Sequence, residues 1–252
     1  MRLTIDVAMR TDRGLVREQN EDAVGGDPSE GLIILADGMG GANAGEVASQ
    51  LAVDLLVSQL VGDEEAQGEP LDAGKLQEAM RGVNQAILEL SCQVPEYAGM
   101  GTTLVVGLFR QTSLIHAHVG DSRLYRLRDG LLETLTTDHT LIQEMVNVGD
   151  FATLEEARLA GVPPNVLTRA FGAEPDVPVD IAETDIREGD LYLFCSDGLT
   201  GMVGDPDIQA VLERNHEDLM DANDELIALA CRMGGMDNIS VILARVMDSN
   251  NE

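Results

Sequence analysis

The sequence predicts an α+β fold built on antiparallel sheets, because strand patterns and helix patterns each come in runs. Four stretches with strand character follow one another between residues 102 and 135, whereas helical patterns occur in pairs within 44–90 and 206–233. A parallel sheet would need strands and helices that alternate along the chain. No linker or internal repeat divides the 252 residues, so we predict one domain over 1–252 with its core at about 3–247.

Two strands and two helices are predicted in the first 90 residues. Apolar and polar residues alternate over 3–9, as in a half-buried strand, and the apolar run over 31–36 indicates a buried strand. Apolar residues recur at helical spacing over 44–61 and 76–90, with the polar segment 62–70 between them. In the first helix, the residues that set this spacing are Val47, Leu51, Leu55 and Val57.

The middle of the chain predicts an antiparallel meander and then an irregular surface insertion. The strand patterns of the meander cover 102–109, 113–119, 123–127 and 131–135. Asp129-Gly130 is typical of the hairpin turn between the last two. Short helices are expected at 139–148 and 153–159, and the segment Gly161-Val162-Pro163-Pro164 cannot continue a helix.

The C-terminal third returns to longer regular elements. The expected order is strands at 179–184 and 191–195, helices at 206–214 and 217–233, and a last strand at 239–246. Residues 250–252 are expected to form a frayed tail.

The charge balance is strongly acidic, with 45 Asp and Glu against 16 Lys and Arg and a formal net charge of −29. Nucleic acid and anionic membrane surfaces are therefore poor partners. The acids are spread along the whole chain, so we interpret most of them as a solvated surface and only a few as chemical groups.

The sequence also favours a cytoplasmic location. It contains no apolar stretch long enough to span a membrane, and its first residues lack the apolar segment of a signal peptide. The three cysteines, Cys92, Cys195 and Cys231, are too few and too widely spaced for a disulfide framework or a thiolate zinc site.

Four acids lie beside Gly or Asn where the chain leaves or enters a predicted strand. They are Asp37, Asp121, Asp197 and Asp237. Any one of them could simply form a turn. Short carboxylates that point from strand ends into one cleft, however, form an all-oxygen site suited to Mg²⁺ or Mn²⁺. Glycine beside the acid lets a backbone carbonyl come close enough to be a further ligand.

A charged cluster near the N-terminus adds Arg17, Glu21 and Asp22. The guanidinium of an arginine is a planar fork of donors suited to phosphate, and adjacent acids can orient water at a metal. Taken alone, this cluster is equally well explained as a charged loop.

Eight short motifs follow in order between Thr11 and Val246. They are Arg17-x-x-x-Glu21-Asp22, Asp37-Gly38-Met39-Gly40-Gly41, Met100-Gly101-Thr102-Thr103, Val119-Gly120-Asp121-Ser122-Arg123, Thr137-Asp138-His139, Leu167-Thr168-Arg169-Ala170-Phe171-Gly172, Cys195-Ser196-Asp197-Gly198-Leu199 and Asp237-Asn238-Ile239-Ser240-Val241. In this order they resemble the metal-dependent serine/threonine protein phosphatases of type 2C (the PPM family), in their bacterial form.

The resemblance implies a four-layer sandwich, in which two antiparallel β-sheets are flanked by helices on both outer faces and a metal cleft lies at one edge. It also implies that residues at about 147–166 form an irregular flap beside this cleft. The implied cofactors are Mn²⁺ or Mg²⁺, with two ions bound tightly and a third more weakly.

Carried over motif by motif, the resemblance implies a role for each candidate residue. Asp37 would bridge two metals, the Gly38 carbonyl would bind the second, and Asp197 and Asp237 would complete the first. Asp121, with Asp197, would hold the third. Arg17 matches the phosphate-binding arginine, and Glu21 and Asp22 match acids that hold metal-bound waters.

The implied activity is direct hydrolysis of phosphoserine and phosphothreonine on proteins by a metal-activated water, without a phosphoenzyme. The implied partners are a phosphorylated protein substrate and a cognate Ser/Thr kinase whose action the enzyme reverses. We expect a monomer.

Two departures from the family pattern bear on mechanism and specificity. Met39 stands where many eukaryotic members have a histidine proposed as general acid, so protonation of the leaving group is unassigned. Gly161-Val162-Pro163-Pro164 stands where many bacterial relatives carry His-Pro in the flap, which leaves the substrate preference open.

Other classes of function fit the sequence less well. A non-catalytic phosphoprotein- or metal-sensing module on the same fold is the main alternative, but every matched side-chain ligand is acidic. A cysteine phosphatase is excluded, because no arginine follows any cysteine by six residues. His116 and His118 lie two apart on one predicted strand, which fits a zinc pair or ordinary packing, and His139 is expected to make a structural hydrogen bond. We interpret Asn215-His216-Glu217 as a helix start.

Overall fold

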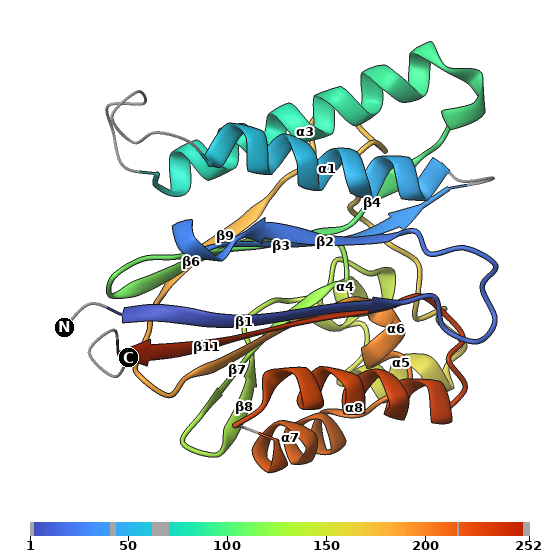
Figure 1. Ribbon diagram of the computed structural model, residues 1–252. Helices are drawn as coiled ribbons and strands as arrows, with labels where there is room; N and C mark the ends of the chain where they lie inside the picture. Colours follow the sequence, from blue (N-terminus) through green and yellow to red (C-terminus); the bar gives the residue numbers. More distant parts are fainter. Residues whose placement is uncertain (1–2, 41–43, 62–70, 216, 249–252) are drawn as a thin grey trace.

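The computed structural model describes residues 3–40, 44–61, 71–215 and 217–248. It places them in four layers, a pair of helices, two stacked sheets and a second pair of helices (Figure 1). This confirms the expected α+β sandwich. The predicted connection at 62–70, His216 and the tail at 250–252 lie outside the described residues.

One sheet is built from both ends of the chain. In spatial order it consists of β1 (Leu3–Asp12), β11 (Ile239–Asp248), β10 (Leu191–Cys195), β7 (Arg123–Arg128) and β8 (Leu131–Thr134), all antiparallel. β1 pairs with β11 along its whole length, from Leu3 opposite Asp248 to Asp12 opposite Ile239. Because the first and last strands pair within one sheet, the segments between them belong to the same folded unit, which favours the predicted single domain.

The other sheet contains the strand with the continuous apolar run predicted from the sequence. Its order is β2 (Asp22–Asp27), β3 (Leu32–Met39), β5 (Leu104–Phe109), β6 (Ser113–Val119) and β9 (Asp180–Asp185), with β4 (Gly101–Thr102) paired to the end of β3. Along β3, Ile33 and Leu35 pack between the sheets, whereas Leu32 and Ile34 pack under helices. Burial on both faces explains the continuous apolar run in the sequence.

Two helix pairs cover the outer faces of the sandwich (Figure 1). The elements are α1 (Ala44–Leu60) and α3 (Ala73–Gln93) on the second sheet, and α7 (Asp205–Arg214) and α8 (Leu219–Arg232) on the first. The predicted apolar stripe of α1 is only partly correct. Val47 and Leu51 are half-buried, and the fully buried face carries Ala48, Ala52 and Leu56 instead. Small alanines allow this helix to lie close to the sheet.

The predicted meander over 102–135 is wrong in one respect, because its strands belong to different sheets. β5 and β6 form a hairpin in the second sheet, and β7 and β8 form a hairpin in the first. The chain crosses between them at Gly120-Asp121-Ser122. Gly120 has φ +104, and a Cβ there would lie 2.6 Å from Thr103 Cβ, so the crossing requires glycine. This crossing places Asp121 at the edge of the sandwich.

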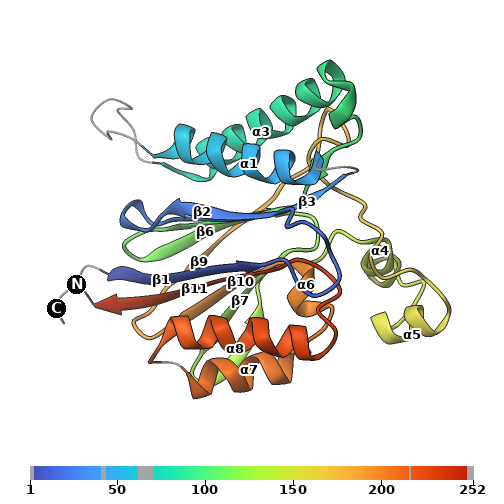
Figure 2. The same cartoon turned by 45° about the vertical axis from the view of Figure 1, so that its right-hand side comes forward.

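The predicted insertion is confirmed as two short helices, α4 (Leu141–Asn147) and α5 (Leu154–Leu159). Thr140 and Thr153 cap them through their hydroxyl groups. Figure 2 shows both helices standing out beside the sheet ends, near the short helix α6 (Asp197–Thr200). Among the described helices, none has the length and apolar character to cross a membrane.

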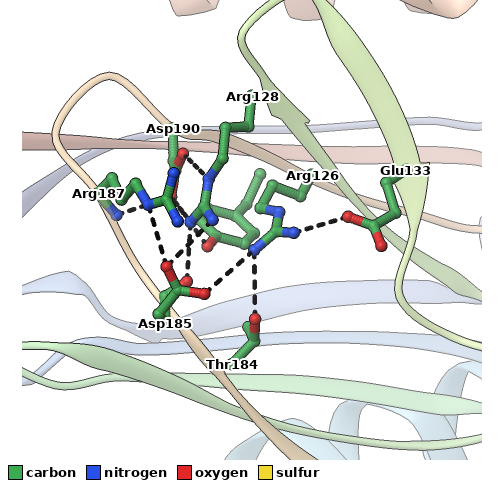
Figure 3. A network of polar contacts seen from close by, with 8 residues as sticks. Arg126, Arg128, Glu133, Thr184, Asp185, Arg187 and Asp190 are labelled. Atoms are coloured by element: carbon green, nitrogen blue, oxygen red, sulfur yellow. Dashed lines mark hydrogen bonds and ion pairs between the residues drawn. The ribbon is translucent and has the colours of Figure 1, made fainter.

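A network of arginines and acids joins the two sheets (Figure 3). Arg126 and Arg128 extend from β7 of the first sheet toward Thr184 and Asp185 of β9 in the second. Arg128 also donates from Nε (2.7 Å) and Nη2 (2.6 Å) to the carboxylate of Asp190, whose side chain is 1% exposed. The bidentate pair fixes the chain just before β10.

We expect Asp190→Asn to lower the free energy of unfolding by about 3 kcal/mol, because it removes the bidentate charged partner of a largely buried guanidinium and leaves it only the exposed Asp185. Urea unfolding followed by circular dichroism measures the loss. The matched control is Asp224→Asn, which breaks a surface ion pair with Arg10 and should cost at most about 1 kcal/mol. Equal losses in the two variants would show that the buried Arg128–Asp190 pair contributes no more to stability than a surface ion pair.

Candidate active site

The four acids predicted at strand ends come together at one edge of the sandwich. Asp37 is near the end of β3 in the second sheet. Asp197 follows β10 and Asp237 precedes β11, both in the first sheet, and Asp121 lies in the crossing between the sheets. The side chains of Asp37 and Asp197 are within hydrogen-bonding reach, and Asp121, Asp197 and Asp237 line one cleft. Both sheets therefore contribute carboxylates to a common site.

These carboxylates are difficult to ionise in the isolated chain. Burial raises the pKa of Asp121 to about 7 and that of Asp197 to about 6, and repulsion from neighbouring carboxylates adds to the effect. The pKa of Asp37 is raised well above its ordinary value by burial and then by Asp22, Asp197, Asp121 and Asp237. A cluster of oxygen donors with surplus negative charge fits a hard divalent cation.

Glycine follows two of the acids because the backbones approach closely there. A Cβ on Gly38 would overlap the carbonyl oxygen of Gly45 and lie 2.5 Å from that of Glu21. A Cβ on Gly198 would overlap the carbonyl oxygen of Asn238. These Asp-Gly pairs are therefore packing requirements of the site as well as turn signals.

Asp22 joins the same cluster from β2, a strand that the sequence analysis did not predict. It lies opposite Asp37 in the pairing of β2 with β3, and burial raises its pKa to about 7. Its Oδ2 accepts a hydrogen bond of 2.9 Å from Ser196 Oγ, whereas its Oδ1 has no partner among the described residues. A buried carboxylate oxygen without a donor is a second sign that the cluster is built for a cation or its water.

Arg17 and Glu21 lie at the rim of the cluster. Arg17 Nη2 donates a hydrogen bond of 2.6 Å to Asp237 Oδ2. This hydrogen bond is the main cause of the raised pKa of Arg17. Glu21 accepts a hydrogen bond from the backbone of Gly45 at the start of α1, and burial raises its pKa. The structure therefore brings all the candidate side chains to one end of the sandwich.

Asn238 is a positioning residue that the sequence analysis missed. Its Nδ2 donates to the carbonyl oxygens of Arg13 (2.9 Å) and Gln19 (2.8 Å), and its Oδ1 accepts from the Glu21 backbone (2.8 Å). These three bonds hold the loop that carries Arg17 against β11. The one available signal was an asparagine directly after a candidate ligand.

His139 supports the turn that carries Asp121. It makes the structural hydrogen bond that was expected from the sequence. The Gly120 backbone donates to its Nδ1 (3.1 Å), so the ring hydrogen is on Nε2, which contacts Asp180 Oδ2 (3.1 Å). Burial lowers the pKa of His139, which keeps the ring neutral. Among the described residues, His118, His139 and Asp180 lie within 4.8 Å of one another and could hold a metal, and His116, for which zinc binding and ordinary packing were both left open, is not in this group.

The cleft lies between the flap and the loops of the first sheet. Arg158, Pro164 and Asn165 line it from the flap, and Met202 and Met236 line it from the loops of the first sheet. Cys195 is fully buried beneath it, and burial raises its thiol pKa to about 12. This cysteine is therefore a packed core residue.

Comparisons with known proteins agree with this geometry. The family model described as protein phosphatase 2C matches residues 14–232. The chain is 42% identical to the serine/threonine protein phosphatase PstP of Mycobacterium tuberculosis over 246 residues, which is 98% of this chain and 46% of that protein. It thus spans about half the length of this relative. It is also 37% identical to the serine/threonine phosphatase stp of Listeria monocytogenes, with 93% of each chain covered.

A solved structure shows the same fold. The crystal structure of the PstP catalytic domain in complex with two manganese ions matches with a TM-score of 0.84 and 40% identity, over 98% of this chain and all of that one. Sequence, fold and the position of the acidic cleft thus lead to one conclusion: the chain belongs to the protein phosphatase 2C family.

Proposed function

We propose that this chain hydrolyses phosphoserine and phosphothreonine on proteins in a metal-dependent reaction. The observation that carries the proposal is the convergence of Asp22, Asp37, Asp121 and Asp197 in a buried cluster, where loss of solvent and then mutual repulsion favour a bound cation. The names of the relatives from Mycobacterium and Listeria and the manganese bound in the PstP structure support it.

In this proposal the metal ligands are Asp37, the Gly38 carbonyl, Asp121, Asp197 and Asp237, and the ions are Mn²⁺ or Mg²⁺. Such ions would activate water for attack on phosphorus and offset the charge of the phosphoryl oxygens. Each side-chain ligand is attached to a strand end or to a turn fixed by hydrogen bonds, so the chain sets their positions before any ion arrives.

The remaining candidate residues would bind the phosphate and the water molecules of the cleft. Arg17 has one donor nitrogen directed at Asp237, and its other donors, which make no hydrogen bond to the described residues, could bind phosphoryl oxygens. Glu21 and Asp22 would accept hydrogen bonds from water inside the cleft. Because Cys195 is buried and its thiol pKa is about 12, it cannot serve as a nucleophile, which supports direct hydrolysis without a phosphoenzyme.

The proposal extends to the partners and setting of the enzyme. Its substrate would be a phosphorylated protein, and a Ser/Thr kinase would supply that substrate, since hydrolysis reverses phosphoryl transfer. We propose a monomer in the cytoplasm, without nucleic-acid or membrane partners, on the strength of the net charge of −29. All matched side-chain ligands are acidic, which favours an active enzyme over a non-catalytic sensing module.

Substitutions of the carboxylates test the proposal. Metal-stripped protein should hydrolyse p-nitrophenyl phosphate and a phosphothreonine peptide only after Mn²⁺ or Mg²⁺ is added. Asp37→Asn and Asp237→Asn should lower kcat/KM by at least about 100-fold, because each removes a charge that holds the ions. Asp121→Asn should slow turnover while two ions still bind by calorimetry.

The control variant is Asp54→Asn, an exposed acid on α1 that should keep full activity. Near-normal activity of Asp37→Asn would reject the bridging role. Absence of metal-dependent hydrolysis of both substrates by folded protein would reject the proposed function.

The raised pKa values predict an unusual pH dependence of stability in EDTA. A carboxyl whose pKa is higher in the folded than in the unfolded chain stabilises the fold while it is protonated, and this contribution is lost as pH rises. The unfolding temperature of the metal-free protein should therefore fall between pH 5 and pH 8, as Asp197, Asp22 and Asp121 ionise near pH 6 to 7. Added Mn²⁺ should restore it at pH 8.

Differential scanning calorimetry measures this dependence. Asp121→Asn should flatten it, whereas Asp54→Asn should not, which separates the cluster from the general surface charge. An unfolding temperature in EDTA that is the same at pH 5 and pH 8 would contradict the raised pKa values.

A further inference from the structure

A chain of hydrogen bonds runs from the surface at β9 to the turn that carries Asp121. Its outer members are Asp180, the first residue of β9, and Arg169. Its inner members are His139 and Gly120. None of the eight sequence motifs contains Asp180, so the sequence assigns it no role.

His139 holds Gly120 at both of its backbone polar groups. The Gly120 N–H donates to His139 Nδ1 over 3.1 Å, and the His139 backbone N–H donates to Gly120 O over 2.9 Å. These two bonds fix the peptide groups on either side of Gly120, and the second of these groups includes the backbone nitrogen of Asp121. The orientation of Asp121 therefore depends on a His139 ring whose Nδ1 is a hydrogen-bond acceptor.

Asp180 stabilises the tautomer of His139 that this arrangement needs. A neutral imidazole has one donor and one acceptor nitrogen, so a ring that accepts at Nδ1 has its hydrogen on Nε2. Asp180 Oδ2, at 3.1 Å, is the acceptor for that hydrogen. Arg169 Nη1 lies 3.2 Å from the same ring nitrogen and favours the opposite tautomer, but it also donates to Asp180 Oδ1 over 2.9 Å. Asp180 thus accepts from the ring and binds the cation that competes for it.

The surroundings of His139 favour this positioning role over a metal site. His118, which pairs with Asp180 between β6 and β9, stacks on His139 with ring centroids 4.6 Å apart and an interplanar angle of 13°. Both ring nitrogens of His139 already make hydrogen bonds. A metal held by His139 would have to break one of these bonds and lie beside the guanidinium of Arg169.

We propose that Asp180 is a positioning residue for the weaker cation site, and that it acts through the tautomer of His139 on the turn of Asp121. The inference rests on the proposed function, in which Asp121 and Asp197 hold the third ion. Without Asp180, the Nε2 atom would be left beside the donor of Arg169. The ring would then carry its hydrogen on Nδ1, where it opposes the N–H of Gly120.

Metal binding and the tautomer are both measurable in Asp180→Ala. The variant should bind the third Mn²⁺ about tenfold more weakly and the two tighter ions unchanged, since partners behind a metal ligand tune its affinity on this scale. Electron paramagnetic resonance, which counts free Mn²⁺ during a titration, measures the loss. ¹⁵N NMR of the four histidines, recorded without metal, should show the hydrogen of His139 moving from Nε2 to Nδ1. The side chain of Asp180 is 51% exposed, so its truncation leaves no cavity in the core.

Two further variants separate the tautomer from a general loss of structure. Asp180→Asn retains an oxygen that can accept from Nε2, and it should bind the third ion within about threefold of the unsubstituted protein. Arg169→Leu added to Asp180→Ala removes the competing donor. This double variant should restore the hydrogen on Nε2 and most of the affinity for the third ion.

The matched control is Asp185→Ala. Asp185 lies at the other end of β9, has a side chain 58% exposed and also pairs with arginine, but it belongs to the network of Arg128. Its loss should leave the affinity for the third ion unchanged.

Three results would overturn the inference: unchanged third-ion affinity in Asp180→Ala, a loss of affinity with the hydrogen still on Nε2, or an equal loss in Asp185→Ala. A metal ion found on His139 by X-ray diffraction would also overturn it. Unsubstituted protein that binds no Mn²⁺ would instead reject the proposed metal-dependent function itself.

Discussion

The structure depends on holding several like-charged carboxylates in one small, poorly solvated space. Water normally separates such groups, and burial together with repulsion raises the pKa of Asp22, Asp37, Asp121 and Asp197. The rest of the fold holds the carboxylates in place despite this unfavourable free energy. Strands from both sheets end at the cluster, and the hydrophobic layers between and outside the sheets fix those strands in place. The same repulsion that destabilises the metal-free chain provides its affinity for cations.

Uncharged side chains do most of the positioning around the cluster. Asn238 ties the loop of Arg17 to β11, and Ser196 donates to Asp22. His139, kept neutral by burial, holds the Gly120 backbone and so the turn of Asp121. Neutral hydrogen-bonding groups add no further charge, so they fix geometry while the carboxylates remain available to a cation.

Much of the fold could be predicted from the sequence, because local patterns encode local structure. The strand at 191–195 and the helix at 153–159 agree closely with β10 and α5. β2 was missed because Gly25, Gly26 and Asp27 carry no alternation of apolar and polar residues. The meander was misplaced because period-two patterns show that strands exist, and not which sheet each one joins. That distinction depends on the crossing at Gly120.

The candidate side chains were identified from motifs, and the structure brings them together, but their supports could not be predicted. Nothing local in the sequence shows that Asn238 reaches across to residues 13–21, or that Asp180 lies behind His139, since both contacts join distant segments. The buried face of α1 was likewise set by alanines against the sheet, which a count of large apolar residues overlooks.

The central claim is that the carboxylates of the two sheets form an all-oxygen site for divalent cations. X-ray diffraction from crystals grown with Mn²⁺, recorded where manganese scatters anomalously, tests it most directly. The account predicts anomalous peaks among Asp37, Asp197 and Asp237 and a weaker peak beside Asp121. Absence of peaks within this cluster, or peaks only at His118, His139 and Asp180, would contradict it.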